Sequence, residues 1–347
     1  MLDAIRDEIK RHRRHFDRPL HVGVFKLGGH GDFMQQVAFA RAVRHKWPAK
    51  QATLTLLSRF DANGVNDHIL QGASFVDSCI QVPTGDWRHM VQELSPAFDV
   101  FYDVQYVAGV YYRDKQRFAA QQLDANTRLA RYAAYYSRFP WSNADLGETG
   151  QSQWDMLARS SGLDVSETDL HILPDAGEGV VPPGAYVTLH NAAGGGSDAK
   201  CMPSAAFHAI ARRVRAQGMM PVHVGTESEP LIHGCLDRRG LPIRATAAVI
   251  AGARLHVDIE GGLVYVARAV GTRSVVFFGP TPVVTFGFQD NVNVSLARCR
   301  PCWWSRPAWG ADCPKGQATC RNMPAPRQAA DIVERTIEEM SACTSPS

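Results

Sequence analysis

Short apolar segments that are typical of β-strands alternate along the whole chain with longer segments that are typical of α-helices. The strand-like segments are 21–27, 52–57, 75–82, 98–105, 186–190, 221–224, 255–259 and 274–278, and the helical ones are 33–46, 87–94, 114–145, 203–217 and 326–340. Such alternation predicts parallel sheets covered by helices, because a parallel connection has to cross the sheet and usually does so through a helix. We therefore expect an α/β protein.

The alternation stops once, between residues 173 and 184, in a stretch rich in proline and glycine. Such a stretch is typical of a linker, and 347 residues are enough for two domains. We expect an N-terminal domain over 1–175, a C-terminal domain over 184–325, and a terminal helix and tail over 326–347. Each domain would be a doubly wound, Rossmann-like sheet, and the two would face a central cleft.

The composition narrows the class of protein. Hydrophobic residues make up 45% of the chain and charged residues 20%, as in folded globular proteins. A net charge of +3 is too small to indicate a nucleic-acid partner. No apolar run reaches the ~18–20 residues that span a membrane, and residues 1–18 lack the apolar core of a signal peptide. We therefore expect a cytoplasmic protein.

The first segment, residues 2–18, combines apolar residues at helical spacing with several arginines and lysines. Two interpretations stay open. It is either a surface helix that docks on its own domain, or a peripheral contact with the anionic surface of the inner membrane. Acidic residues between the basic ones favour the docked helix.

The first strand-like segment ends in a glycine-rich turn, Gly28-Gly29-His30-Gly31-Asp32, directly before a helical segment. Its spacing matches neither the dinucleotide fingerprint nor a P-loop. Glycines let backbone amides approach a ligand, and the N-terminus of a helix favours anions. Asp32 lies at the carboxyl end of a strand, where ligands bind in open α/β sheets. From the residues alone, Asp32 is either a helix N-cap or a catalytic base.

Two further loops of this kind follow strand-like segments in the second half. Residues 189–200 form a glycine-rich loop that contains Asn191 and ends in Lys200, and amides with an ammonium suit a diphosphate. The run Glu260-Gly261-Gly262 offers amides for a phosphate and a carboxylate for sugar hydroxyls. A flexible surface loop and a plain helix cap are the alternatives. Because carboxyl ends of parallel strands meet at one edge of a sheet, we expect these loops to converge with Gly279-Pro280-Thr281.

A cysteine cluster lies near the C-terminus, at Cys299, Cys302, Cys313 and Cys320. A CxxC pair followed by two more cysteines is typical of a metal knuckle, and zinc or iron accepts four thiolates. Four protein ligands leave no open coordination position, so the metal would be structural. A disulfide pair, which a reducing compartment disfavours, and a set of buried thiols are the alternatives.

Taken together, the loops resemble those of the ADP-heptose heptosyltransferases, which are inverting glycosyltransferases of the two-domain GT-B type. The matching parts are Lys26 followed by Gly31 and Asp32, the 189–200 loop, and the segments 250–253, 260–263 and 278–281. The resemblance covers most of the chain from Val22 onward. The Cys-x-x-Cys-Trp-Trp segment also resembles a cysteine insert of some members, including heptosyltransferases that modify bacterial autotransporter proteins.

The resemblance implies roles for single residues. Asp32 would be the general base, and Lys200 would bind the donor diphosphate. Either Glu227 or Glu229 fits the region that contacts the nucleoside ribose, and we take Glu227. The residues assigned to donor binding are thus Gly31, Asn191, Lys200, Glu227, Glu260, Gly261 and Gly262.

The chain also departs from the family pattern. Glu260 stands where the family often has aspartate, Gly261 replaces a threonine, and Tyr265 replaces a common histidine. The donor loop is longer and richer in glycine than usual. ADP-heptose is the donor that the resemblance implies, and another nucleotide sugar stays open.

The expected function is transfer of a sugar, with inversion, from a nucleotide-diphosphate donor to a hydroxyl of lipopolysaccharide core or of a protein. The chemical step would need neither a metal ion nor another cofactor, because Lys200 and loop amides stabilise the leaving diphosphate. A sugar-nucleotide epimerase or hydrolase on the same fold is one alternative, and it would turn over the donor without an acceptor. A non-catalytic nucleotide-sugar-binding protein is the other.

Overall fold

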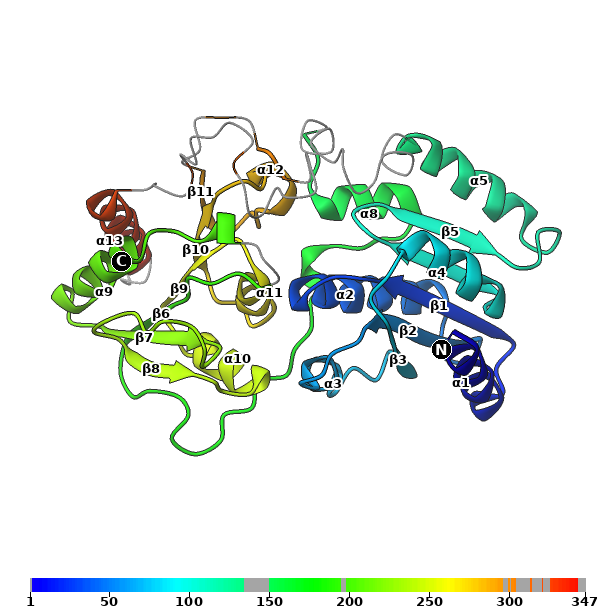
Figure 1. Cartoon of the computed structure of the whole chain (residues 1–347), viewed down its shortest axis with the longest axis horizontal. Helices are drawn as coiled ribbons and strands as arrows, with labels where there is room; N and C mark the ends of the chain where they lie inside the picture. The colour runs from blue at the N-terminus through cyan, green and yellow to red at the C-terminus, as the bar shows by residue number, and fades with distance from the viewer. Residues whose placement is uncertain are drawn as a thin grey trace. The chain divides into compact units, whose positions relative to one another are not determined.

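The computed structural model describes residues 2–133, 150–194, 198–295, 299, 301–303, 313, 320 and 325–342. The described chain forms two compact units, the first made of residues 2–133 and 152–171 and the second made of residues 150–151 and the described residues from 172 onward. Each unit has one β-sheet with helices around it (Figure 1). The predicted α/β class with two wound sheets is confirmed. The described residues include no helix long and apolar enough to cross a bilayer.

Unit 1 contains a five-stranded sheet in the order β3-β2-β1-β4-β5. Its strands are β1 (Leu20–Lys26), β2 (Ala52–Arg59), β3 (Ser78–Val82), β4 (Val100–Val104) and β5 (Ala108–Tyr112). Its helices are α1 (Leu2–Phe16), α2 (His30–Lys46), α3 (Val65–Leu70), α4 (Trp87–Leu94), α5 (Ala119–Ala130) and α8 (Gln153–Ser161), with short 3₁₀ helices at Ser95–Ala97 and Glu167–Asp169.

Alternation along the strands assigns the helices of unit 1 to the two faces of its sheet. Phe25 and Phe101 belong to one core cluster with Ile5 and Ile9 of α1 and with residues of α4. The neighbouring Tyr102 points the other way and meets Phe39 of α2, with ring centroids 5.5 Å apart. The apolar face of α1 is therefore used for packing, which agrees with the docked helix that the sequence favoured over a membrane contact.

Unit 2 contains a six-stranded sheet in the order β11-β10-β9-β6-β7-β8, in which every described pairing is parallel. Its strands are β6 (Tyr186–Leu189), β7 (Met220–Gly225), β8 (Leu236–Arg239), β9 (Leu255–Ile259), β10 (Ser274–Phe278) and β11 (Val292–Ser295). Its helices are α9 (Ser204–Ala216), α10 (Ile243–Ala251), α11 (Gly262–Ala269), α12 (Val283–Phe286) and α13 (Pro326–Ala342), with a 3₁₀ helix at Asp198–Lys200.

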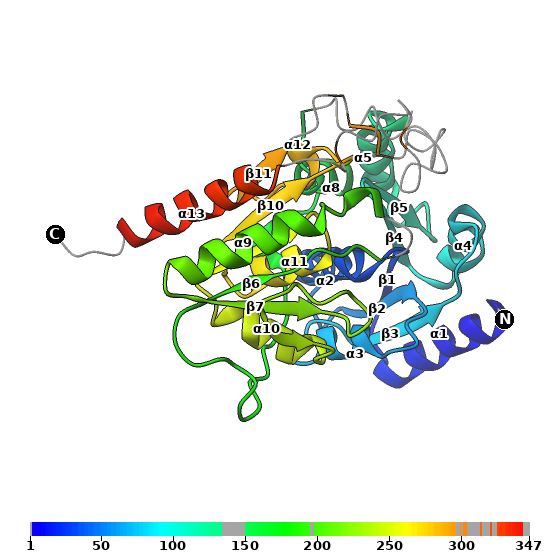
Figure 2. The same ribbon diagram turned by 60° about the vertical axis from the view of Figure 1, so that its left-hand side comes forward.

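The C-terminal helix α13 is part of unit 2. It lies beside α9 in both views (Figures 1 and 2), and the two helices share one core with the sheet. Phe207 and Ile210 of α9 belong to that core together with Val333 and Ile337 of α13.

Both sheets reverse their winding direction once. In unit 1 the chain moves outward from β1 to β2 and β3, then returns to β4 on the other side of β1. In unit 2 it moves from β6 to β7 and β8, then returns to β9. Ligands of open α/β sheets bind outside the carboxyl ends of the strands at such a reversal, here β1 with β4 and β6 with β9.

Some predicted elements were wrong in type or extent. Strand β5 runs antiparallel to β4, so the sheet of unit 1 is not wholly parallel. Residues 75–77 do not begin β3, because the Asp77 carboxylate accepts the backbone amide of Leu54 and pairs with Arg18 and Arg44. The long helix predicted over 114–145 shortens to α5, and residues 134–149 lie outside the described residues.

Gly23 in the middle of β1 gives a test of this packing. A Cβ atom there would lie 2.9 Å from the rings of both Phe98 and Phe101, which are buried and have no room to move. Gly23→Ala should therefore lower the free energy of unfolding of unit 1 by about 1–3 kcal/mol, measured by urea unfolding. The matched control is Gly85→Ala, whose Cβ would meet only the terminal methyl of Met90 at 3.0 Å. Equal effects of the two variants would contradict the packing described for β1.

Candidate functional site

In unit 1, Asp32 lies in the first turn of α2, at the carboxyl end of β1. The helix begins at His30, three residues earlier than predicted, so Gly29 is the N-cap and Asp32 is not. One oxygen of the Asp32 carboxylate, Oδ2, accepts the backbone amide of Gly29 at 3.0 Å. The other, Oδ1, lies 3.3 Å from Nζ of Lys26, and the side chain remains 31% exposed. Asp32 thus stabilises the start of α2 and still presents a carboxylate to solvent.

The residues around Asp32 come from the ends of β1 and β4. Lys26 is the last residue of β1 and is buried. Its ammonium donates to the backbone carbonyl of Gln105 at 2.9 Å and lies 5.1 Å from the centroid of the Tyr106 ring. Asp103 of β4 is also buried, and burial raises the pKa of its carboxyl to about 7, although a hydrogen bond from Gln105 opposes the shift.

In unit 2, Lys200 and Glu260 form an ion pair, with Nζ and Oε2 2.5 Å apart. Glu260 follows β9, and Lys200 ends the loop that follows β6, so the reversal of the sheet brings them together. Gly261 is the N-cap of α11 and Gly262 its first residue, so their amides belong to a helix N-terminus, which favours anions. The arrangement combines a cation, a carboxylate and helix-end amides.

The predicted convergence of the loops in unit 2 is confirmed. A Cβ atom on Gly279 would lie 3.0 Å from the carbonyl oxygen of Ala199, so the loop after β10 packs directly on the residue before Lys200. The side chain of Asn191 accepts the amide of Met202 at 2.9 Å and donates to its carbonyl at 3.0 Å. Asn191 therefore closes the loop that ends in Lys200.

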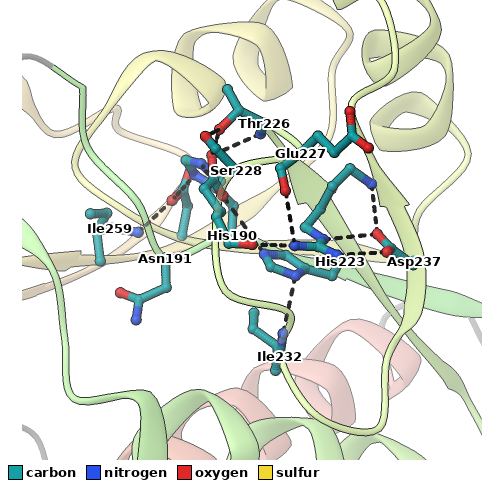
Figure 3. A network of polar contacts seen from close by, with 12 residues as sticks. His190, Asn191, His223, Thr226, Glu227, Ser228, Ile232, Asp237 and Ile259 are labelled. Atoms are coloured by element: carbon teal, nitrogen blue, oxygen red, sulfur yellow. Dashed lines mark hydrogen bonds and ion pairs between the residues drawn. The ribbon is translucent and has the colours of Figure 1, made fainter.

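A buried network centred on His190, to which the sequence analysis assigned no role, lies at the start of this loop (Figure 3). His190, directly after β6, places Nδ1 2.7 Å from Oδ1 of Asp258 and Nε2 3.5 Å from Oε2 of Glu229. Burial by itself would lower the pKa of His190, but the Asp258 and Glu229 carboxylates raise it to about 10. The imidazolium in turn lowers the pKa of Asp258 against the opposing effect of burial. His190 is therefore a charged group at neutral pH.

The network separates the two glutamates that the sequence left as alternatives. Glu229 accepts the backbone amide of Thr226 at 2.8 Å and its hydroxyl at 2.9 Å, and it is turned toward His190. The side chain of Glu227 is exposed and points away from His190 (Figure 3). Between the two, Glu227 presents its carboxylate to solvent, whereas Glu229 supports the interior.

Gly31 lies beside Asp32 in the first turn of α2, and thus in unit 1, whereas all the other residues assigned to donor binding lie in unit 2. Sequence reasoning assigned no role to Lys26, His190 or Asp258. A signal was available for Asp258, because His256 and Asp258 alternate with apolar residues inside a strand. A buried charge in such a position needs a partner.

The four clustered cysteines are half-buried. Within the described ranges, no three side chains of His, Cys, Asp or Glu lie close enough together to hold a metal ion. Burial and the neighbouring thiols of Cys320, Cys313 and Cys299 raise the pKa of Cys302 to about 11, so the four are electrostatic neighbours. The backbone amides of Cys302 and Trp303 both donate to the carbonyl of Pro280 at 3.1 Å. Cys302 and Trp303 are therefore attached to the loop after β10.

The charge on His190 predicts a pH dependence of stability. Because its pKa in the folded state, about 10, exceeds its ordinary value of 6.5, its contribution is full below pH 6.5 and is lost as the pH rises through 10. The contribution changes by at most about 1.4 kcal/mol per pH unit. The variant His190→Gln/Asp258→Asn removes both charges and should flatten the pH dependence of hydrogen-exchange protection in β6 and β9. Equal slopes in this variant and the wild type would contradict a charged His190.

No protein-family model matches the chain, and no curated protein matches it. Solved structures do. A glycosyl transferase family 9 structure from Veillonella parvula DSM 2008 has 14% identity and a TM-score of 0.58, and the match covers 93% of this chain and 98% of that one. The dodecameric iron-containing heptosyltransferase TibC of enterotoxigenic E. coli H10407, in complex with ADP-D-β-D-heptose, has 14% identity and a TM-score of 0.61, over 95% and 77% of the two chains.

A third solved structure is the E. coli heptosyltransferase WaaC with ADP-2-deoxy-2-fluoro heptose. It has 14% identity and a TM-score of 0.50, and the match covers 92% of this chain and 99% of that one. At this level of identity the likeness concerns the fold. The two wound sheets, each with one reversal between its central strands (β1 with β4, and β6 with β9), thus form the GT-B fold of these glycosyltransferases.

Proposed function

We propose that this protein is a glycosyltransferase that moves a sugar, with inversion, from a nucleotide-diphosphate donor to an acceptor hydroxyl. The observation that carries the proposal is the Lys200–Glu260 pair beside the N-terminus of α11, at the reversal of a sheet in a GT-B fold. That combination offers positive charge and backbone amides for a diphosphate, and a carboxylate for sugar hydroxyls.

ADP-heptose is the donor class that we propose. Both TibC and WaaC are glycosyltransferases with this fold, and they are described in complex with ADP-D-β-D-heptose and with an ADP-heptose analogue. In this proposal Lys200 and the amides of Gly261 and Gly262 hold the diphosphate. Glu260 accepts hydrogen bonds from the sugar, and the exposed carboxylate of Glu227 accepts them from the ribose. Asn191 acts by closing the loop that carries Lys200.

Asp32 is the proposed general base. As the acceptor oxygen attacks the anomeric carbon, its proton passes to the Asp32 carboxylate, and the bond from that carbon to the diphosphate oxygen breaks. The electron pair of the broken bond stays on the nucleoside diphosphate, where Lys200 and the α11 amides stabilise the new charge. No step in this scheme uses a metal ion. The acceptor hydroxyl belongs to lipopolysaccharide core or to a protein.

The assignment of the base predicts a separation of catalysis from donor binding. Asp32→Asn should lower kcat by about 100-fold or more, because a general base contributes about 10²–10⁴-fold, while the donor still binds. The rate is measured by mass spectrometry with ADP-heptose and an acceptor panel, and binding of ADP-heptose by calorimetry. Lys200→Met should instead act on the donor. It should weaken binding of ADP-heptose about 10-fold or more, since it removes a charged hydrogen bond.

The matched control is Asp67→Asn, which removes another exposed carboxylate from the first turn of a helix, α3. It should leave both measurements unchanged. Transfer retained in Asp32→Asn would contradict the assignment of the base. Turnover of ADP-heptose at the same rate with and without every acceptor would favour a hydrolase or an epimerase instead.

We also propose that Cys299, Cys302, Cys313 and Cys320 hold a structural zinc or iron ion. The support is the CxxC pair followed by two more cysteines, and the three thiols of Cys299, Cys313 and Cys320 near Cys302. The four side chains would have to draw closer together around the ion. A tetrahedral sulfur set suits either metal, and TibC is described as iron-containing. The ion would stabilise the turn that is bonded to Pro280 and would take no part in the transfer.

Metal analysis tests this site. The purified full-length chain should contain about one equivalent of zinc or iron, and Cys302→Ser should lose most of it, because a structural site needs all four ligands. Cys79→Ser, which changes a cysteine of unit 1, is the control and should retain the metal. Less than about half an equivalent in the wild-type protein, purified without chelator, would count against the site.

A further inference from the structure

Lys26 is a buried ammonium in the interior of unit 1. It is 2% exposed, so bulk solvent reaches little of its charge. Two groups from the end of β4 contact it, the carbonyl of Gln105 at 2.9 Å and the ring of Tyr106 at 5.1 Å. A charge in such a place is costly unless the protein surrounds it with partners, so its position needs a reason.

The third partner of this ammonium is Asp32, the proposed base. Its two carboxylate oxygens are held from different sides, Oδ1 by Nζ of Lys26 at 3.3 Å and Oδ2 by the amide of Gly29 at 3.0 Å. Gly28, at φ +155°, makes room for this arrangement, because a Cβ atom there would lie 2.3 Å from the carboxylate. Two fixed donors on two oxygens define the plane of the carboxylate.

We propose that Lys26 is a positioning residue for catalysis: its buried ammonium connects the end of β4 to Asp32 and holds the carboxylate in the orientation that receives the acceptor proton. The inference rests on the proposed function of Asp32. Lys26 itself, being buried, does not touch the acceptor. It acts through the rotamer of Asp32, whose side chain keeps 31% of its surface exposed for the substrate.

The surrounding charges allow Lys26 to keep this place while the proton moves. When Asp32 takes the acceptor proton it loses its charge, and the ammonium keeps the Gln105 carbonyl, the Tyr106 ring and the electrostatic attraction of Asp103. Burial lowers the pKa of Lys26, and Asp32 and Asp103 oppose this shift. An apolar side chain of similar length would fill the space and lose the contact with Asp32.

A double-mutant cycle tests the proposal with the full-length protein, ADP-heptose and an acceptor that the wild type uses. Lys26→Met should lower kcat by about 10- to 100-fold, the effect of a misplaced catalytic group, with the donor Kd and the acceptor KM nearly unchanged. In the Asp32→Asn background, the same change should alter the residual rate by less than about twofold, because Lys26 acts through Asp32. A merely structural lysine would instead lower the rate equally in both backgrounds, which would overturn the proposal.

Further variants keep the result interpretable. Lys26→Gln retains a donor for the Gln105 carbonyl but has no charge, and it should follow Lys26→Met if the latter does not fold. Its crystal structure should show the Asp32 carboxylate in another rotamer, whereas an unchanged rotamer would overturn the proposal without any activity measurement. Lys46→Met is the matched control, since Lys46 also lies near an aromatic ring, Trp47 at 5.8 Å, but at the other end of α2.

Failure of this inference and failure of the proposed function give different results. A wild-type rate in Lys26→Met, with Asp32→Asn inactive, would overturn the role of Lys26 and leave Asp32 as the base. A wild-type rate in Asp32→Asn would overturn the base and the positioning role together.

Discussion

Both halves of the chain depend on the reversal of winding in a parallel sheet. Crossover connections between parallel strands are almost always right-handed. Where the winding reverses, the connections after two neighbouring central strands therefore leave in opposite directions, and a space opens between the loops at the carboxyl ends of these strands. The carboxyl ends of β1 and β4 in unit 1, and of β6 and β9 in unit 2, are therefore the places where polar groups can gather without blocking one another. The candidate residues lie at these ends.

Ion pairs fix the positions of the charged side chains at the carboxyl ends of the strands in each unit. Lys26 with Asp32, Lys200 with Glu260, and His190 with Asp258 each join residues from different segments of one unit. A buried charge without its partner would be costly. Each pair therefore holds together the two segments from which its residues come. The same pairing holds the carboxylate of Asp32 and the ammonium of Lys200 in the places that the proposed transfer needs. Rigid placement of this kind is what catalysis by proton transfer and charge stabilisation requires.

Several features of the fold could be predicted because they are local. The strand-like runs at 255–259 and 274–278 match β9 and β10, and the helical run at 87–94 matches α4. Strand β5 was missed because its hairpin with β4 depends on pairing rather than on periodicity. The start of α2 was predicted too late because Gly29, not Asp32, is its N-cap. Asp32 lies in the first turn instead, where its carboxylate accepts the backbone amide of Gly29.

The sequence by itself determined the α/β class, the glycine-rich turns at the ends of strands, and the identity of Asp32, Lys200 and Glu260 as candidates, because each of these is a property of neighbouring residues. Only the tertiary structure decided which groups meet. It joined Lys26 to Asp32 and turned Glu229 inward while leaving Glu227 exposed. It also placed an imidazolium between two carboxylates at His190. The contacts of His190 join residues far apart in the chain, and they depend on the order of the strands, which local patterns do not encode. Lys26 and Asp32 are close in the chain, but their contact depends on how β1 turns into α2.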